Sequence, residues 1–362
     1  MGVLNNQPSI ISLRLCGKNN KRIFSTMTKT PKQRFNDFIS RRDRSEIPVI
    51  PMIAGDHAAF IAGYTLREVC QSGKKLADAL EHTFRIYSHD LVIVFSDVTV
   101  EAEALGAVLE FSDDRPPFIV KYPDVFKVKP ANPCTDGRMP ELLFAAERCC
   151  ERIGSEVTIS CSLKDPFSLS ALIYEPNAFF RDLLQNPHRI REILAISLEN
   201  QLAYLREIIA VGALPFIGAP LASGSLISPK IFEQFVVPSL KPLFELIHQH
   251  SLPVCIHICG DSQTIIDSLI ALKPDIISVD QLDLPRCVRE YPESIFMGNL
   301  STTLLLQGPP EHIFSATTFL LDSIKEKFIP ATGCDVPMKT PPEHIHTMIQ
   351  AVRTASGENR CP

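Results

Sequence analysis

At 362 residues the chain is longer than an average domain, yet it falls within the size range of a single α/β barrel. Hydrophobic residues make up 45% of the sequence and charged residues 21%, a balance typical of a soluble globular enzyme. The formal charge of −5 argues against nucleic acid as a partner, and the sequence has no uninterrupted apolar run of about 18 residues that could form a membrane-spanning helix.

The amino-terminal segment differs in composition from the rest of the chain. Residues 1–36 contain no Asp or Glu, and they carry several Lys and Arg residues among serines and amides. This composition resembles an organelle transit peptide. The alternative, which we favour, is that translation starts at Met27 and that the preceding residues are an upstream extension read in frame. We therefore predict a disordered extension over residues 1–30 and a single catalytic domain over residues 31–355.

Strand-length apolar runs alternate with helical patterns along the remaining chain. The predicted strands are 48–53, 91–95, 157–161, 214–217, 254–257, 276–279, 295–297 and 328–329. The main predicted helices are 75–87, 189–211, 230–250, 264–272 and 311–327, with Pro229 and Pro310 in first turns. This alternation predicts parallel strands joined by crossover helices. A doubly wound open sheet would alternate in the same way, but the count of eight strands favours a (β/α)8 TIM barrel.

The carboxyl ends of the predicted strands are where such a barrel places its chemistry. Polar groups or potential metal ligands follow nearly all of them: Asp97 after the second strand, residues 219–228 after the fourth, 257–261 after the fifth, Asp280 after the sixth, Asn299 after the seventh and 333–338 after the eighth. We give Asp280 and Asn299 less weight than the others.

A histidine and two cysteines at these strand ends form a candidate metal site. His257 and Cys259 are two residues apart, so an extended backbone points both side chains the same way. Cys334, after the eighth strand, is the candidate third ligand. One imidazole and two thiolates suit Zn²⁺ and leave a fourth position for a substrate. Taken alone, an H-x-C pair at the end of a buried strand is more often part of the core, and its position in the barrel is what favours the metal site.

The other cysteines do not indicate a disulfide framework, because the total of 11 is odd and the spacings are irregular. A reducing cytoplasm is therefore the predicted location. Several cysteines lie in apolar stretches and are predicted to be core residues: Cys70, Cys149, Cys150, Cys161 and Cys255.

Several separated motifs, in order between about Pro31 and Arg353, resemble the uroporphyrinogen decarboxylase superfamily. The motifs are Val94-Phe-Ser-Asp97 with Glu103-Ala-Leu-Gly106, Ala222-Ser-Gly-Ser-Leu-Ile-Ser-Pro-Lys230, His257-Ile-Cys-Gly260, Gly298-Asn-Leu300, and Gly333-Cys-Asp-Val-Pro337 with Thr340-Pro-Pro-Glu343. Within the superfamily they are most similar to the methylcobamide:coenzyme M methyltransferases.

This resemblance implies a function and a set of site residues. Such methyltransferases carry zinc on an H-x-C pair and a distal cysteine, which here correspond to His257, Cys259 and Cys334. The implied reaction moves a methyl group from a methyl-corrinoid on a partner protein to a thiol such as coenzyme M, with the metal lowering the pKa of the thiol. Asp97 matches the catalytic aspartate of the decarboxylases, so it is a candidate catalytic residue, although an aspartate at this place could equally cap a loop.

The sequence also departs from both branches of the superfamily. The arginine-containing R-Q-A-G-R segment of the decarboxylases is replaced by Ile53-Ala-Gly-Asp-His57, and Cys334 stands where the decarboxylases have a histidine. A porphyrinogen with four carboxylates needs cationic partners, so decarboxylation is the second hypothesis. A non-catalytic corrinoid-handling protein is the third. The methyltransferases often have an acidic residue before the A-S-G stretch, where this chain has Ala219-Pro-Leu221, and this leaves the thiol acceptor open.

Overall fold

The computed structural model describes residues 29–43, 45–324 and 327–357. Residues 1–28, which form most of the predicted amino-terminal extension, lie outside them. The strands of the described chain are β1 (Leu91–Val94), β2 (Val108–Glu110), β3 (Phe118–Lys121), β4 (Thr158–Lys164), β5 (Leu214–Gly218), β6 (Cys255–Asp261), β7 (Ile276–Gln281), β8 (Ile295–Leu300) and β9 (Phe328–Thr332).

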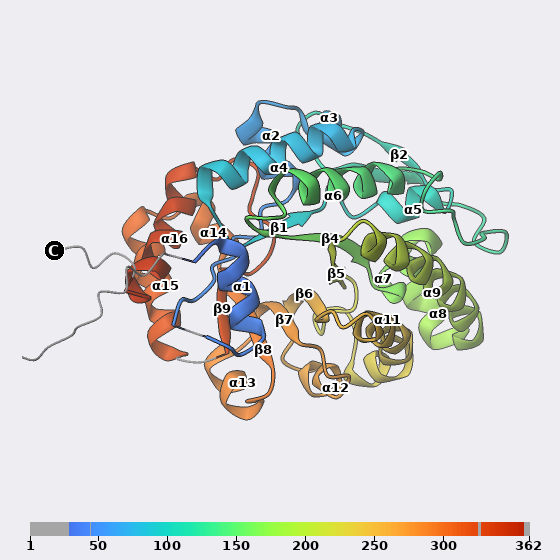
Figure 1. Cartoon of the computed structure of the whole chain (residues 1–362). Helices are drawn as coiled ribbons and strands as arrows, with labels where there is room; N and C mark the ends of the chain where they lie inside the picture. The colour runs from blue at the N-terminus through green and yellow to red at the C-terminus, as the bar shows by residue number, and fades with distance from the viewer. Residues whose placement is uncertain (1–28, 44, 325–326, 358–362) are drawn as a thin grey trace, which may run out of the picture.

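Seven of these strands form one parallel sheet in the order β1-β4-β5-β6-β7-β8-β9, which curls so that its two edges approach each other (Figure 1). The predicted first strand, residues 48–53, lies between the edges. Ile50 forms a parallel bridge with Ala331 of β9, and Val49 accepts a hydrogen bond from the Asp90 backbone N–H beside β1. The predicted (β/α)8 barrel is therefore confirmed, although its first strand is irregular because Pro48 and Pro51 have no N–H to donate.

Apart from α1, which lies across one end of the barrel, the helices surround the sheet (Figure 1). In chain order the helices are α1 (Pro31–Ile39), α2 (Gly55–Ala62), α3 (Leu66–Cys70), α4 (Gly73–Tyr87), α5 (Val100–Ala104), α6 (Met139–Ile153), α7 (Pro166–Tyr174), α8 (Pro176–Gln185), α9 (Pro187–Ala210), α10 (Pro229–Ile231), α11 (Val237–Gln249), α12 (Ile266–Ile270), α13 (Leu284–Glu290), α14 (Thr302–Gln307), α15 (Pro310–Ser323) and α16 (Pro342–Ala355). None of the helices in the described part of the chain is both long and apolar enough to cross a lipid bilayer.

The main predicted helices lie where helices are observed, but α12 and α15 are shorter than the predicted segments 264–272 and 311–327, and one predicted helix is interrupted. Pro229 and Pro310 occupy first turns, as predicted. The predicted helix 230–250 is divided into α10, a π-helical turn over Phe232–Val236, and α11. Pro242 lies inside α11, where it cannot donate the hydrogen bond of a regular helix. The hairpin of β2 and β3 was not predicted, because both strands are short and lack a buried face.

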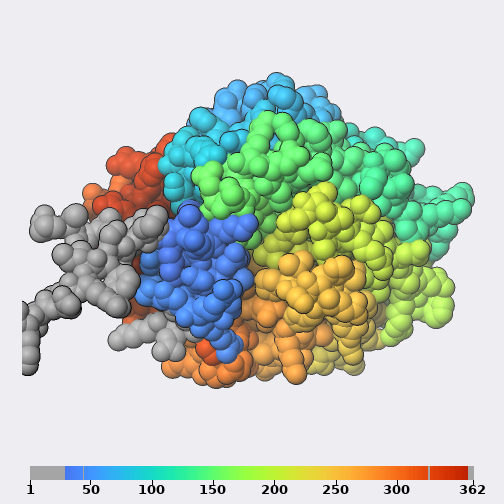
Figure 2. Space-filling view, in the orientation of Figure 1, coloured from blue at the N-terminus to red at the C-terminus, as the bar shows by residue number. Residues whose placement is uncertain are grey.

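The core has an outer layer between strands and helices and an inner cluster inside the barrel. The inner cluster takes alternate residues of the strands, such as Leu91 and Ile93 of β1, together with the predicted core residue Cys255. Phe35 and Phe38 of α1 belong to the same cluster, so α1 closes the amino-terminal end of the barrel. Figure 2 shows α1 at the surface of this face.

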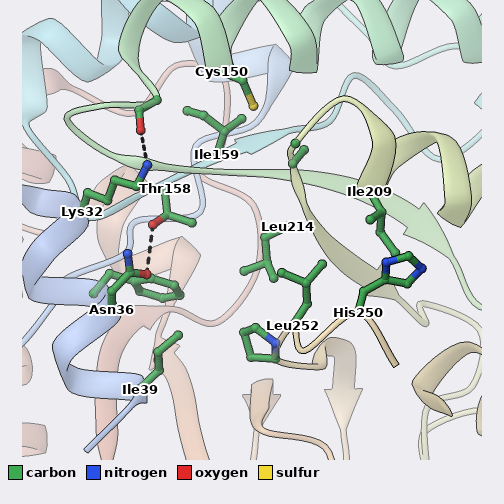
Figure 3. Close-up of a pocket in the computed structure, with 15 residues that line it drawn as sticks. Lys32, Asn36, Ile39, Cys150, Thr158, Ile159, Ile209, Leu214, His250 and Leu252 are labelled. Carbon is green, nitrogen blue, oxygen red and sulfur yellow. Dashed lines mark hydrogen bonds between the residues drawn. The ribbon is translucent and has the colours of Figure 1, made fainter. Parts of the chain in front are cut away.

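A cavity lies beside α1 at this amino-terminal end, next to the first residues of β4 and β5 (Figure 3). Within it Lys32 donates to the Gly154 carbonyl, and the Thr158 hydroxyl donates to Asn36 Oδ1 at 3.4 Å. In the described chain, the one cluster of potential metal ligands lies elsewhere, among residues of β6 and the segment after β9.

Candidate metal centre

Two of the predicted metal ligands lie on β6, toward the carboxyl end of the barrel. His257 Nε2 is 3.0 Å from Cys259 Sγ, as expected for side chains two residues apart on a strand. The register of β6 with β7 shifts after Ile258, and Gly260 has a φ of +67°. A Cβ atom at Gly260 would lie 2.9 Å from the Ser225 hydroxyl, so the loop after Cys259 can approach this closely only with glycine.

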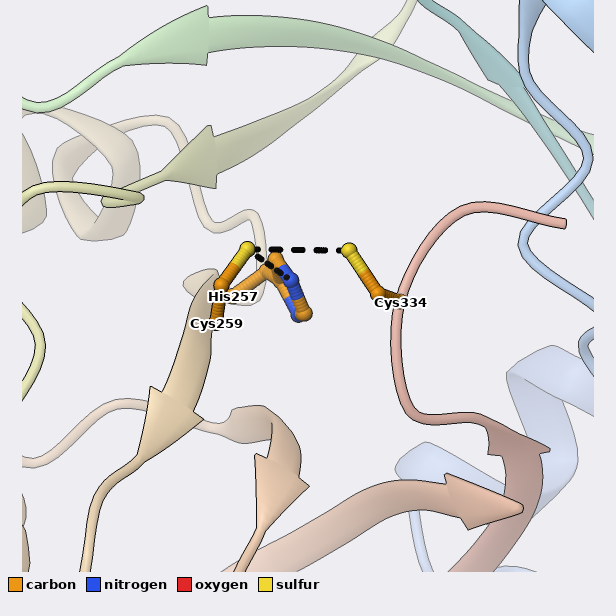
Figure 4. A group of neighbouring side chains, drawn as sticks. All are labelled: His257, Cys259 and Cys334. Carbon is orange, nitrogen blue, oxygen red and sulfur yellow. Dashed lines mark hydrogen bonds between the residues drawn. The ribbon is translucent and has the colours of Figure 1, made fainter. Parts of the chain in front are cut away.

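The third predicted ligand, Cys334, reaches the same place from the segment after β9. Its Sγ lies 3.6 Å from Cys259 Sγ, although the two residues are 75 positions apart in the sequence (Figure 4). The ligand atoms of His257, Cys259 and Cys334 all lie within 4.8 Å of one another. The structure therefore brings the three predicted ligands together.

Asp280 of β7 lies between the two loops that carry the cysteines. Its Oδ2 accepts a hydrogen bond from the Gly260 backbone N–H at 3.1 Å. On the other side, a Cβ atom at Gly333 would lie 2.6 Å from Asp280 Oδ1, so a larger residue could not occupy this position without a shift. Asp280 thus forms a hydrogen bond to the loop that carries Cys259 and packs closely against the segment that carries Cys334.

A buried serine orients the imidazole of His257. Ser278 of β7 is fully buried, and its hydroxyl is 3.0 Å from His257 Nδ1. A hydrogen bond at Nδ1 leaves Nε2, the nitrogen that faces Cys259, available for a metal ion. The predicted strand 276–279 contains Ser278, but the sequence pattern did not mark it as part of the site.

The two thiols have pKa values shifted in opposite directions. The hydrogen bond with Cys259 outweighs burial and, with a smaller contribution from His257, lowers the pKa of Cys334 to about 4. The same hydrogen bond, together with burial, raises the pKa of Cys259 above its usual range. The opposite directions of the two shifts mean that one thiol loses its proton more readily than the other, and a divalent cation is the kind of ligand that would let both sulfurs ionise.

A small cavity of about 60 Å³ adjoins the three residues. Its walls are mainly apolar, and its polar lining residues include Ser162, Lys164 and Asp335. Nearby, burial and the charge of Cys334 raise the pKa of Asp56 to about 6. The cavity is thus suited to a ligand with a short apolar part whose end meets the sulfur and nitrogen ligands.

Comparison with protein families supplies the chain's classification. A family model described as uroporphyrinogen decarboxylase (URO-D) matches residues 30–355. The chain belongs to the URO-D family. The match spans the predicted barrel, and the motifs quoted above lie within it.

The relatives of this URO-D family chain include methyltransferases and decarboxylases. It is 24% identical to the methylcobamide:CoM methyltransferase MtbA of Methanosarcina mazei, over 90% of this chain and 98% of that protein. It is 24% identical to the uroporphyrinogen decarboxylase of Carboxydothermus hydrogenoformans, over 81% of this chain and 86% of that protein. A solved structure, a methyltransferase from Methanosarcina mazei, superposes with a TM-score of 0.83 at 20% identity and covers 91% of this chain and 99% of that one. This likeness supports the barrel fold.

Asp97, the predicted catalytic aspartate, does not join the metal-ligand cluster of this URO-D family chain. Its carboxylate is buried and pairs with both terminal nitrogens of Arg138, at 2.5 and 3.1 Å, and it also accepts a hydrogen bond from the Thr99 hydroxyl. Burial would raise the pKa of Asp97, but the charge and hydrogen bonds of Arg138 outweigh it and lower the pKa. These contacts fit the alternative role, in which Asp97 caps a loop. A catalytic role for Asp97 stays a prediction.

The remaining predicted positions have structural contacts. Asn299 donates to the Leu282 carbonyl at 3.1 Å, and Ala219 donates its backbone N–H to the His257 carbonyl at 2.8 Å. The predicted core cysteines are buried, except that Cys150 is partly exposed. Lys164 was missed because β4 runs three residues beyond the predicted strand 157–161. Had the strand been extended, Lys164 would have been recognised as a residue at its carboxyl end.

Proposed function

We propose that the chain is a zinc-dependent methyltransferase that moves a methyl group from a methyl-corrinoid on a partner protein to a small thiol such as coenzyme M. The observation that carries the proposal is the convergence of His257, Cys259 and Cys334 within 4.8 Å at the carboxyl end of the barrel. Support comes from relatives over 90% of the chain that are named methylcobamide:CoM methyltransferases.

The donor set fits Zn²⁺ in number and chemistry. One imidazole nitrogen and two sulfurs are common zinc ligands, and a three-residue set leaves a position for substrate. With Nε2 facing the metal, His257 donates its Nδ1–H to the Ser278 hydroxyl, which is the type of support that zinc-binding histidines usually have. Zinc bound there would lower the pKa of a substrate thiol, so that the thiol loses its proton near neutral pH.

The protein's own residues would bind and orient the reactants. The apolar cavity walls would exclude water from the thiol, and the open carboxyl end of the barrel would admit the corrinoid protein. In the proposed transfer the thiol sulfur bonds to the methyl carbon, the cobalt–carbon bond breaks with both electrons remaining on cobalt, and the thiol proton leaves to solvent. No general acid is needed at the methyl group, which agrees with the burial of Asp97 in its ion pair. We propose that Asp97 contributes by fixing the loop that follows β1.

Two further parts of the hypothesis concern the whole chain. We propose that residues 31–355 form one catalytic domain, for which the family match to residues 30–355 is support. We also propose a reducing, cytoplasmic setting, since it would keep the site's thiols available for a metal.

The test combines metal analysis with a methylcobalamin demethylation assay on purified protein. We expect about one zinc per chain and a thiol-dependent shift of the cobalamin spectrum toward the demethylated form. Cys334→Ser should lose most of the zinc and the activity, whereas Cys134→Ser, at an exposed cysteine, should keep both. Full zinc occupancy in Cys334→Ser would refute the metal site. Conversion of uroporphyrinogen to coproporphyrinogen would instead support the decarboxylase hypothesis.

A further inference from the structure

Lys164 places a positive charge at the same cavity as the candidate metal ligands. It is the last residue of β4, it is only 2% exposed, and it lines the cavity with His257, Cys259 and Cys334. No other lysine and no arginine is found among the described residues that line the cavity. Half of the other lining residues have apolar side chains: Met52, Ile93, Phe95, Val98, Phe216 and Pro220.

Lys164 forms a buried ion pair with Glu101 in which Nζ donates no hydrogen bond. Its Nζ lies 3.7 Å from Glu101 Oε2, an ion-pair distance that is too long for a hydrogen bond. The other oxygen, Glu101 Oε1, accepts from the Lys164 backbone N–H at 2.8 Å and from Gln201 Nε2 at 3.4 Å. Glu101 is buried behind Lys164 and is not part of the cavity lining.

The N–H groups of the Lys164 ammonium are therefore available to a ligand. Within the described chain Nζ has no hydrogen-bond acceptor, and its further contact is the ring of Phe95, 4.8 Å away. Asp335, the carboxyl group in the lining, forms no ion pair with Lys164 among the described residues. A buried ammonium group with unused N–H donors is costly unless a ligand or water supplies acceptors.

We propose that Lys164 is the specificity-determining residue for the acceptor, binding an anionic group at the end of the thiol remote from its sulfur. The inference rests on the proposed function, because it assumes that the thiol enters this cavity. The apolar walls lower the local dielectric and strengthen the pairing of the ammonium group with an anion. A single ammonium acts as a point charge, so carboxylate and sulfonate thiols both belong to the expected class.

The experiment compares thiols matched in shape but not in charge, using the zinc-loaded full-length protein and methylcobalamin. The acceptors are 3-mercaptopropionate, its neutral amide and 2-mercaptoethanesulfonate. Comparing the first with the second tests the effect of charge, and comparing the first with the third tests whether carboxylate or sulfonate is preferred. In Lys164→Met we expect the ratio of kcat/KM for each anionic thiol to that for the amide to fall by about 30-fold or more. Lys241→Met, at a side chain 67% exposed, should leave the ratio unchanged.

A binding measurement gives a readout that does not depend on turnover. Propionate and ethanesulfonate should raise the Tm of the wild-type protein, and propionamide should not. Because Lys164→Met leaves Glu101 buried without its partner, the double variant Lys164→Met/Glu101→Gln serves as a second test that removes both charges together. Both variants should lose the anion-dependent Tm shift.

The outcomes separate this inference from the proposed function. An unchanged selectivity ratio, or an anion-dependent Tm shift that persists in both variants, would overturn the role of Lys164. Equal Tm shifts from propionate and propionamide in the wild type would also overturn it. If the wild-type protein fails to demethylate methylcobalamin with each of the thiols tested, the proposed function is refuted. The binding comparison would still decide whether Lys164 binds an anion.

Discussion

Replacing Ser278 with alanine tests whether the support of His257 matters for metal binding. Ser278 is fully buried, and its hydroxyl, 3.0 Å from His257 Nδ1, is the hydrogen-bond partner of that nitrogen. Without the Ser278 hydroxyl the imidazole can rotate or take the other tautomer. Ordering the imidazole then costs part of the metal-binding free energy. Loss of such a partner typically weakens metal affinity by about 10- to 100-fold, which corresponds to about 1.4 to 2.8 kcal/mol.

The assay is competition for zinc with a chelating dye at fixed pH and ionic strength. Ser262→Ala is the matched control, because Ser262 is also fully buried but its hydroxyl has no hydrogen-bond partner in the described chain. We expect Ser278→Ala to bind zinc about 10- to 100-fold more weakly than the wild type and Ser262→Ala to bind it about equally well. Equal zinc affinities for all three proteins would refute the reasoning, since Ser278 would then contribute only to packing.

Two further predictions follow from the contacts around the site. Asp97→Asn should keep its zinc and lose methyl-transfer rate, and at pH 7 it should lower the free energy of unfolding by about 3 kcal/mol because Arg138 stays buried without this partner. The lowered pKa of Asp97 means that its stabilisation is present above the unfolded-state pKa and is lost as the pH falls through the folded-state value. In urea unfolding the difference between the two proteins should therefore begin to shrink below about pH 4 and vanish once the pH is below the folded-state pKa. Gly260→Ala should weaken zinc binding in the dye assay, because φ is +67° and the new Cβ would meet the hydroxyls of Ser225 and Ser223 at 2.9 and 3.0 Å; zinc affinity equal to that of the wild type would contradict a rigid loop at this point.

Local patterns in the sequence were sufficient to predict the barrel and to select the three candidate ligands. The strand segments are apolar runs bounded by turn residues, and parallel strands bring all their carboxyl ends to one face of a barrel. His257 and Cys259 share a strand, so their juxtaposition follows from the two-residue period of an extended backbone. Cys334 could be added because it follows the last predicted strand.

Contacts between residues far apart in the chain were decided only by the tertiary structure. Asp97 meets Arg138 across 41 residues, and no local pattern distinguishes an aspartate in such a pair from one that faces a substrate. Ser278 becomes a support for His257 only because β7 pairs with β6 in a register that places the two side by side. Lys164 faces the cavity because β4 continues past its apolar run, and the length of a strand is set by the hydrogen bonds of its neighbours rather than by its own residues.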